Sequence, residues 1–305
     1  KFMPLEEIKP GMQGKCYTVF SGTTVEPFDF EVISIEYDAL PDWDIIWVKC
    51  SGRNIEKTGV ASGMSGSPAY IDGRLIGALA AGYANQREDS NIFGMTSIEL
   101  MIQVTQRGMT PNLSYQGQGH QLFNLESSWI SQTAEILPFG NNPTTNRKTA
   151  NFSDVRLGNA NPSELKTPVA MSGINPRMLN LLQPVFEKYK MLPLQAAGGS
   201  SPVKSAPIEA GQVVGTEIVR GDFSAFGFGT ITYVDENKQL LGYGHSSSGE
   251  GHVNRPMSGG YVHYIHPSIT LPFKVVSPTQ PIGTIVQDRQ GAIAGIVGDS
   301  PSYIP

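Results

Sequence analysis

Cysteine and long apolar runs are both scarce in this sequence. Its only cysteines are Cys16 and Cys50. Two cysteines exclude a disulfide framework and a cysteine-rich metal site. They could pair with each other, but two buried thiols are the favoured interpretation, because free cysteine behaves as a small apolar residue. No run of about 18 apolar residues occurs, so we expect no membrane span. No basic and then apolar leader opens the chain, which is compatible with an export signal already removed.

The sequence also lacks a large excess of either positive or negative charge. The chain has 22 Lys and Arg against 27 Asp and Glu, which gives a net charge of −5. No basic cluster stands out, so a nucleic-acid partner is not expected. No group of residues has the spacing of metal ligands, and we predict neither a metal nor another cofactor. With 305 residues, 39% of them hydrophobic, the chain can bury a sizeable core in about two domains.

A serine between glycines is the most informative motif that is present. It lies in Gly63-Met64-Ser65-Gly66-Ser67-Pro68. Glycine neighbours allow a tight loop on which backbone N–H groups can converge on the oxygen of a substrate carbonyl. Two apolar runs follow, separated by Asp72-Gly73, and this pattern is typical of a two-stranded hairpin. A serine loop followed by a hairpin is how chymotrypsin-type barrels are built.

The residue pattern changes twice along the chain. Residues 1–108 contain short strand-like runs and predict a serine-bearing β lobe, which closes with a helix over residues 96–104. Residues 109–205 are rich in polar and turn residues and predict an irregular linker or insertion, with one helix at Pro176 to Tyr189. Strand-like runs return in residues 206–305. The predicted fold is therefore dominated by β structure, with two barrel lobes and a partly helical, irregular middle.

A serine nucleophile needs a base, which is usually histidine at neutral pH. Among five histidines, His245 follows the apolar run Leu240-Leu241-Gly242-Tyr243-Gly244. A strand that ends in glycines can expose an imidazole at its edge, as a base requires. His252 lies in a glycine-rich loop, where a solvated side chain is the expected outcome.

These motifs resemble the sporulation stage IV B type of serine peptidase, a family related to chymotrypsin-fold proteases. The resemblance rests on the serine motif with its hairpin, and on Gly227-Phe228-Gly229-Thr230-Ile231-Thr232-Tyr233 followed by the Gly-His pair that ends at His245. It implies that Ser65 is the nucleophile, that His245 is the general base, and that the N–H groups of Gly63 and Ser65 form the oxyanion hole.

The order of these residues differs from that of the sporulation enzyme, in which the histidine comes first. Here Ser65 precedes His245, so the two lobes look circularly permuted. A catalytic site is defined by geometry rather than chain order. The family's aspartate falls near Cys50 or Ser51 in this sequence. Asp288 could be the triad acid instead; alternatively, it forms loop hydrogen bonds or a local ion pair, and the enzyme works as a Ser–His dyad.

The resemblance implies a serine endopeptidase whose substrate is a protein or peptide. Self-processing is a further activity that the resemblance suggests. The substrate backbone would add as a strand along Ala80-Ala81-Gly82. The alternative is a catalytically silent or latent barrel that binds peptides without cutting them. An exported, periplasmic or extracellular location follows from the resemblance alone. The sequence leaves the oligomeric state and the cleavage specificity open.

Overall fold

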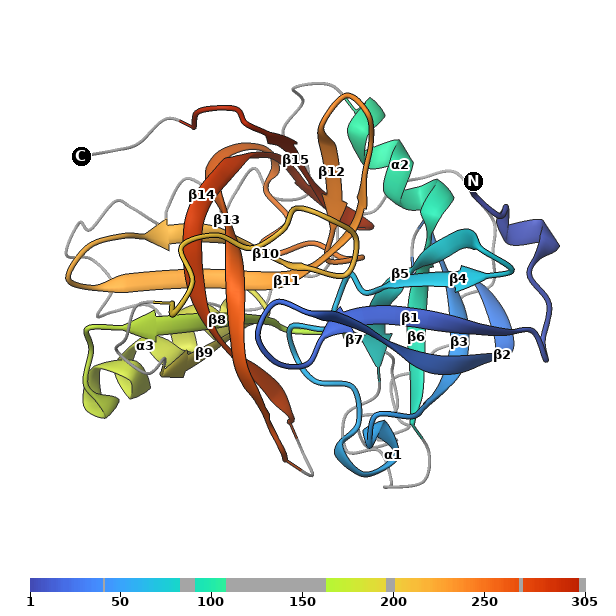
Figure 1. The fold of residues 1–305 in the computed structure, drawn as a ribbon, viewed down its shortest axis with the longest axis horizontal. Coiled ribbons are helices and arrows are strands. Elements are labelled where there is room, and N and C mark those ends of the chain that lie inside the picture. The colour runs from blue at the N-terminus through green and yellow to red at the C-terminus, as the bar shows by residue number, and fades with distance from the viewer. Residues whose placement is uncertain (41, 83–90, 108–162, 196–200, 269–270, 302–305) are drawn as a thin grey trace, which may run out of the picture.

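Two β-barrels side by side form the molecule in a computed structural model that describes residues 1–40, 42–82, 91–107, 163–195, 201–268 and 271–301 (Figure 1). The first barrel follows the strand order β4-β1-β2-β3-β6-β5 and closes through pairing of β4 with β5. Its strands are β1 (Gln13–Val19), β2 (Val25–Leu40), β3 (Trp43–Ser51), β4 (Pro68–Ile71), β5 (Arg74–Gly82) and β6 (Ile92–Ser97).

The second barrel follows the order β10-β13-β14-β15-β12-β11 and closes through pairing of β10 with β11. Strands β8 and β9 extend its sheet beyond β11. These strands are β8 (Thr167–Ser172), β9 (Met191–Gln195), β10 (Val213–Val219), β11 (Ser224–Val234), β12 (Gln239–Gly242), β13 (Gly251–His266), β14 (Phe273–Arg289) and β15 (Ala292–Val297). The predicted fold class, two β-barrel lobes with few helices, is confirmed.

The hairpin predicted behind the serine motif is present as β4 and β5. Asp72 and Gly73 connect the strands, with φ values of 49° and 71°. A positive φ at both central residues is the geometry of the turn that fits strand twist best. The hairpin therefore carries the chain directly away from Ser65 and back along β5.

Short helices cover the barrels: η1 (Leu5–Glu7), α1 (Ile55–Thr58), α2 (Ile98–Gln106) and α3 (Pro176–Lys188). Both predicted helices are found, within two residues of their expected starts. The Ser97 side chain accepts a hydrogen bond from Leu100 N at the start of α2, and Asn175 does the same for Met178 N at the start of α3. Such side-chain caps satisfy backbone N–H groups that have no partner inside the helix.

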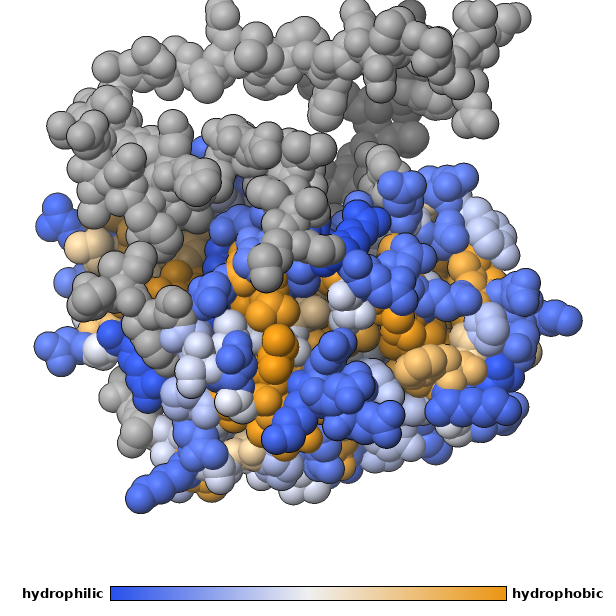
Figure 2. Space-filling model, turned by 90° about the horizontal axis from the view of Figure 1, so that it is seen from above, coloured by the Kyte–Doolittle hydropathy of each residue, from blue (hydrophilic) through white to orange (hydrophobic). Residues whose placement is uncertain are grey.

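Helix α2 joins the two barrels. Its buried side chains pack with residues of β5, β12 and β15 in one apolar cluster that includes Leu75, Met101, Leu241 and Ala294. Figure 2 views the molecule from above, where apolar patches stand among a mainly polar surface. The apolar contact around α2 fixes the two barrels against each other close to the serine loop.

The first barrel encloses both cysteines. Cys16 and Cys50 are free thiols without exposed surface, in a cluster with Phe28, Val48 and Met64. Burial raises the pKa of both thiols, so they act as small apolar side chains rather than nucleophiles. The interpretation of Cys16 and Cys50 as buried thiols is confirmed.

Strand β7 (Ser163–Glu164) pairs with the outer end of β5 in the first barrel. Together with β8, α3 and β9, it belongs to the chain region 109–205 that the sequence predicts as a linker or insertion. The domain boundaries at 108/109 and 205/206 stay predictions.

Candidate active site

Ser65 lies in a tight double turn between α1 and β4. The N–H of Met64 donates to Ala61 O and that of Ser67 donates to Met64 O, both at 2.9 Å. Gly63 and Gly66 have φ values of 94° and 90°, which favour glycine. The Ser65 side chain is fully buried, and in the described part of the chain its Oγ has no hydrogen-bond partner. The glycines thus shape a loop around an uncommitted hydroxyl.

The N–H groups of Gly63 and Ser65 are oriented by the carbonyls of the same peptide units. Ser62 O accepts a hydrogen bond from Lys274 N at 3.0 Å, and Met64 O accepts from Ser67 N and from Ser67 Oγ. Because C=O and N–H point in opposite directions across a trans peptide, the two N–H groups face away from these bonds. Neither has an acceptor among the residues that the structure describes. The loop therefore offers two N–H donors beside Ser65 Oγ.

His245 follows a sharp backbone turn at the end of β12. Tyr243 and Gly244 have φ values of 68° and 71°, and Thr96 Oγ1 donates to Gly244 O at 2.5 Å. The imidazole is buried, and its Nδ1 lies 2.6 Å from Ser246 O. Because a carbonyl oxygen can only accept, Nδ1 carries the hydrogen in this contact and the lone pair of the neutral ring is on Nε2. That tautomer is the one a general base needs.

One side of the serine loop rests on the strands that lead to His245. Thr230 N donates to Ser65 O at 2.8 Å, and Tyr243 N donates to Thr230 O at 3.2 Å. A Cβ on Gly66 would lie 2.4 Å from Tyr243 N. The loop and the backbone just before the histidine are therefore in direct contact.

Leu79 of β5 also touches both motifs. Gly66 N donates to Leu79 O at 2.7 Å, and a Cβ on Gly244 would lie 2.8 Å from the same oxygen. The structure thus brings together the serine loop of the first barrel and the Gly-His turn of the second.

Asp288 of β14 reaches the loop that follows His245. Its buried carboxylate accepts hydrogen bonds from Ser247 N at 2.7 Å, from Ser248 N and Oγ at 2.8 Å each, and from Gly249 N at 3.2 Å. These bonds correspond to the loop-bracing alternative considered for this residue. A role as triad acid stays a prediction.

A polar cluster strengthens the same loop from outside. Arg255 pairs with Glu250 and donates to Ser248 Oγ at 3.2 Å. This ion pair belongs to the hydrogen-bonded surroundings of Asp288, because Ser248 Oγ also donates to the Asp288 carboxylate. The loop after His245 is held by charged groups on two strands.

Two threonine side chains that support the serine loop, and a buried lysine beside it, escaped prediction from the sequence. Thr230 Oγ1 donates to Gly63 O at 2.9 Å, and Thr232 Oγ1 donates to Gly66 O at 2.7 Å. Fully buried Lys274 donates from Nζ to Thr18 Oγ1 at 2.7 Å, and burial lowers its pKa to about 7. Their only sequence signal is a polar residue inside a strand-like run, which many exposed strand positions share.

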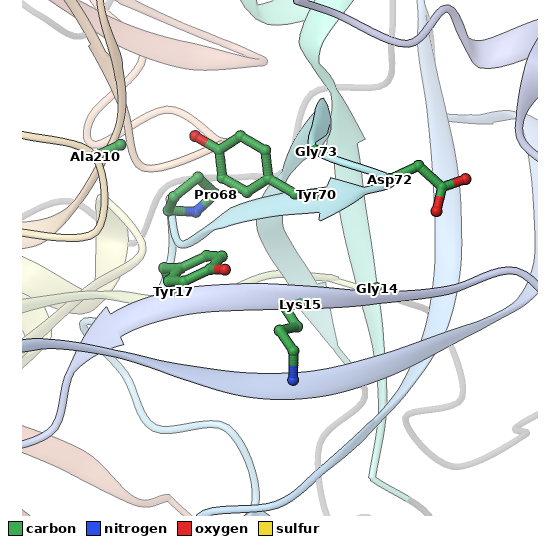
Figure 3. Close-up of a pocket in the computed structure, with 8 residues that line it drawn as sticks. All are labelled: Gly14, Lys15, Tyr17, Pro68, Tyr70, Asp72, Gly73 and Ala210. Atoms are coloured by element: carbon green, nitrogen blue, oxygen red, sulfur yellow. The ribbon is translucent and has the colours of Figure 1, made fainter.

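A surface pocket of about 480 Å³ lies on the outer side of β1 and β4 (Figure 3). Tyr17, Tyr70 and Pro68 form its apolar part, and the two tyrosine rings meet edge to face at 5.6 Å. Neither Ser65 nor His245 lines it. The reactive groups and this pocket are therefore separate features.

The predicted substrate edge, Ala80, Ala81 and Gly82, already carries a strand. Ala81 pairs with Glu164 and Gly82 pairs with Ser163, antiparallel, and Leu165 N donates to Ala80 O at 2.8 Å. A strand can therefore add at this edge, and in this structure the strand is the chain's own β7.

Clusters of metal-binding side chains and long apolar helices are both absent from the described ranges. No group of three or more His, Cys, Asp or Glu side chains there could hold a metal ion. No helix within those ranges is long and apolar enough to cross a membrane.

The architecture defines a protein of two six-stranded β-barrels that meet at a serine loop and a histidine turn. Residues 3–102 match the family model SpoIVB peptidase S55. The resemblance predicted from the sequence is thereby confirmed over the first lobe. The match ends before β11, β12 and His245. No curated protein and no solved structure matches the chain.

Proposed function

We propose that this protein is a serine endopeptidase that cleaves peptide bonds through an acyl-enzyme on Ser65. His245 Nε2 takes the proton of Ser65 Oγ while the oxygen bonds to the substrate carbonyl carbon. The N–H groups of Gly63 and Ser65 stabilise the oxygen that becomes negative. The C–N bond then breaks, and the imidazolium gives its proton to the departing amine. Water, deprotonated by Nε2, hydrolyses the ester and releases Ser65.

Other residues position this machinery. Ser246 O holds the imidazole in the tautomer with hydrogen on Nδ1, which is the role that a third group has in a triad. Asp288 fixes the N–H groups of the following loop. The proposal therefore works as a Ser–His dyad with a backbone carbonyl as orienting group, and an added contribution of Asp288 is compatible with it.

The observation that carries the proposal is the pair of N–H groups at Gly63 and Ser65. Their peptide units are anchored through the carbonyls of Ser62 and Met64, beside a hydroxyl with no partner in the described chain. A purely structural serine loop has no need of uncommitted donors, since buried N–H groups without acceptors cost free energy.

A fluorophosphonate probe, read by intact mass, tests the proposal. We expect stoichiometric labelling of the wild type and none of Ser65→Ala or His245→Ala. His252→Ala is the matched control, because His252 is an exposed histidine of the same barrel, and it should label like the wild type. A well-folded wild type that stays unlabelled would favour the alternative of a barrel that only binds peptides.

Self-processing is a second activity that this site could support, because the chain's own strand lies on the edge proposed for the substrate. Discrete fragments in the wild type but not in Ser65→Ala would establish it. The family resemblance also supports an exported location, which fractionation of the source cells would test.

A further inference from the structure

Strand β7 and Leu165 run along β5 as an added antiparallel strand. Gly82 pairs with Ser163, Ala81 pairs with Glu164, and Ala80 O accepts from Leu165 N. On its other side this end of β5 is paired with β6. Peptides that bind as added strands use such a free sheet edge, with main-chain hydrogen bonds for affinity and side-chain pockets for specificity.

The register places Leu165 nearest the serine loop. Leu79 O accepts from Gly66 N, and Leu79 N donates to Ser67 O at 3.2 Å. Ala80 is the next residue of β5, and its carbonyl holds Leu165. Ser163 and Glu164 extend from there along β5 and away from Ser65. Within the added strand, Leu165 is therefore the residue next to the reactive hydroxyl.

The Leu165 side chain lies in apolar surroundings. It is half-buried and packs against the core cluster of the first barrel, which includes Phe93. A Cβ on Gly82 would lie 3.6 Å from Leu165 Cδ2 and 3.1 Å from the Phe93 ring. Absence of a side chain at Gly82 therefore leaves the space in which Leu165 and Phe93 meet, and none of these three residues is charged.

We propose that Ser163, Glu164 and Leu165 occupy the substrate strand position, with Leu165 in the pocket that selects the residue before the cleaved bond. The cleft thus takes extended peptides with a leucine-like aliphatic residue at that point, and its own strand must leave before another peptide binds. The burial of Ser65 and His245 agrees with a cleft that is already occupied. The selection of a cleavage site rests on the proposed function; the occupancy of the edge does not.

Peptide binding tests the occupancy without catalysis. The probe is a fluorescent peptide with the sequence of residues 162–167, Pro-Ser-Glu-Leu-Lys-Thr, and the protein carries Ser65→Ala. Adding Leu165→Asp should displace β7 and strengthen binding of the probe at least tenfold, since a carboxylate is costly to bury in an apolar pocket. Lys166→Asp, at the exposed neighbouring position, is the control and should leave binding unchanged. Equal binding by the Leu165→Asp and Leu165 proteins would overturn the occupancy.

Two further variants keep this test decisive. Leu165→Ala removes most of the side chain without adding charge, so it should strengthen binding in the same direction if Leu165→Asp fails to fold. Gly82→Ala narrows the pocket, and in the Leu165→Ala protein it should weaken binding of the leucine peptide. A probe with aspartate in place of its leucine should not bind any of these proteins; if it binds equally well, the pocket does not select aliphatic residues.

Catalysis provides the second test, with Ser65 intact. Peptide anilides that differ only in the residue before the anilide should show kcat/KM at least tenfold higher for leucine than for arginine or aspartate. Leu165→Asp should also raise the rate of fluorophosphonate labelling at least tenfold. Labelling without a preference for leucine would overturn the specificity and leave the proposed function standing. Probe binding without labelling in any variant would overturn the proposed function and leave the occupancy standing.

Discussion

Thr230 donates two hydrogen bonds to the serine loop: its N–H to Ser65 O at 2.8 Å, and its hydroxyl to Gly63 O at 2.9 Å. The donor lies in the second barrel and the acceptors lie in the first. The loop that presents Ser65 is consequently shaped by the strand pair that leads to His245. Any displacement between the barrels would disturb the nucleophile, the base and the N–H donors together.

Removal of one interbarrel hydroxyl should therefore affect both stability and reactivity. We expect Thr230→Val to lower the free energy of unfolding by about 1–3 kcal/mol, because the buried Gly63 carbonyl loses a donor, and to slow labelling of Ser65. Thr284→Val is the matched control: Thr284 is equally buried, and its Oγ1 has no partner within the described residues. Chemical denaturation should show the control to be neutral or stabilised. If both variants lose the same free energy of unfolding, the hydrogen bond from Thr230 to Gly63 O contributes nothing to stability.

Gly66 is the position where a side chain should be least tolerated. A Cβ there would lie 2.1 Å from Thr230 O, and the residue has a φ of 90°. We expect Gly66→Ala to cost at least about 4 kcal/mol, at the extreme of point-mutation effects, or to prevent folding.

Gly73 provides the comparison for that substitution. It also has a positive φ, 71°, but its Cβ would meet open space. Gly73→Ala should therefore cost only the left-handed backbone strain of about 1–2 kcal/mol. The difference between the melting temperatures of the two variants measures the cost of the clash at Gly66, because both positions have a positive φ. If they melt at the same temperature, the serine loop does not pack against β11 as the structure has it.

Asp288 should matter for the loop after His245. Asp288→Asn replaces an acceptor oxygen with an NH₂ group that faces the N–H donors of Ser247 to Gly249, and we expect a loss of about 2–3 kcal/mol with slower labelling of Ser65. Asp222→Asn changes an exposed carboxyl of the same barrel and should stay within about 0.5 kcal/mol of the wild type. If Asp288→Asn changes neither the free energy of unfolding nor the labelling rate, then Asp288 neither stabilises the loop after His245 nor acts as the triad acid.

The serine hairpin and the histidine turn could be predicted because local chemistry determines them. Asp72-Gly73 favours a positive φ, and Gly244 allows the turn before His245, so short-range residue types were sufficient. The strand order within the barrels depends instead on pairs far apart in sequence, such as β10 with β13. Strand-like runs do not encode these partners, although their number and spacing indicate the class of fold.

Buried polar contacts between the barrels escaped prediction for a related reason. Threonine is a good strand former whichever way it points, so Thr232 gives no sign that its hydroxyl reaches Gly66 O. Lys274 next to Phe273 reads as an outward-facing charge in an alternating strand, yet it is fully buried. Strand β7 consists of two residues at the border of a polar segment, too short for any periodicity to mark.

Lys274 should make stability depend on pH in the alkaline range. Burial lowers its pKa from 10.5 to about 7 in the folded protein. Between these two values the unfolded chain retains a proton that the folded chain has lost, so the free energy of unfolding rises with pH. The destabilisation by the buried Lys274 ammonium is therefore complete below about pH 7 and disappears above about pH 10.5.

Substitution of Lys274 isolates this effect. Lys274→Met keeps the apolar stem and removes the buried ammonium, so at pH 6 the variant should be more stable than the wild type by a few kcal/mol. This advantage should shrink steadily as the pH is raised to 10. Lys49→Met, at an exposed position of β3, should show no such trend. Denaturant titrations at pH 6, 8 and 10 measure the difference between each variant and the wild type, which cancels the other titrating groups. A difference that does not change with pH would mean that Lys274 keeps its ordinary pKa and reaches water.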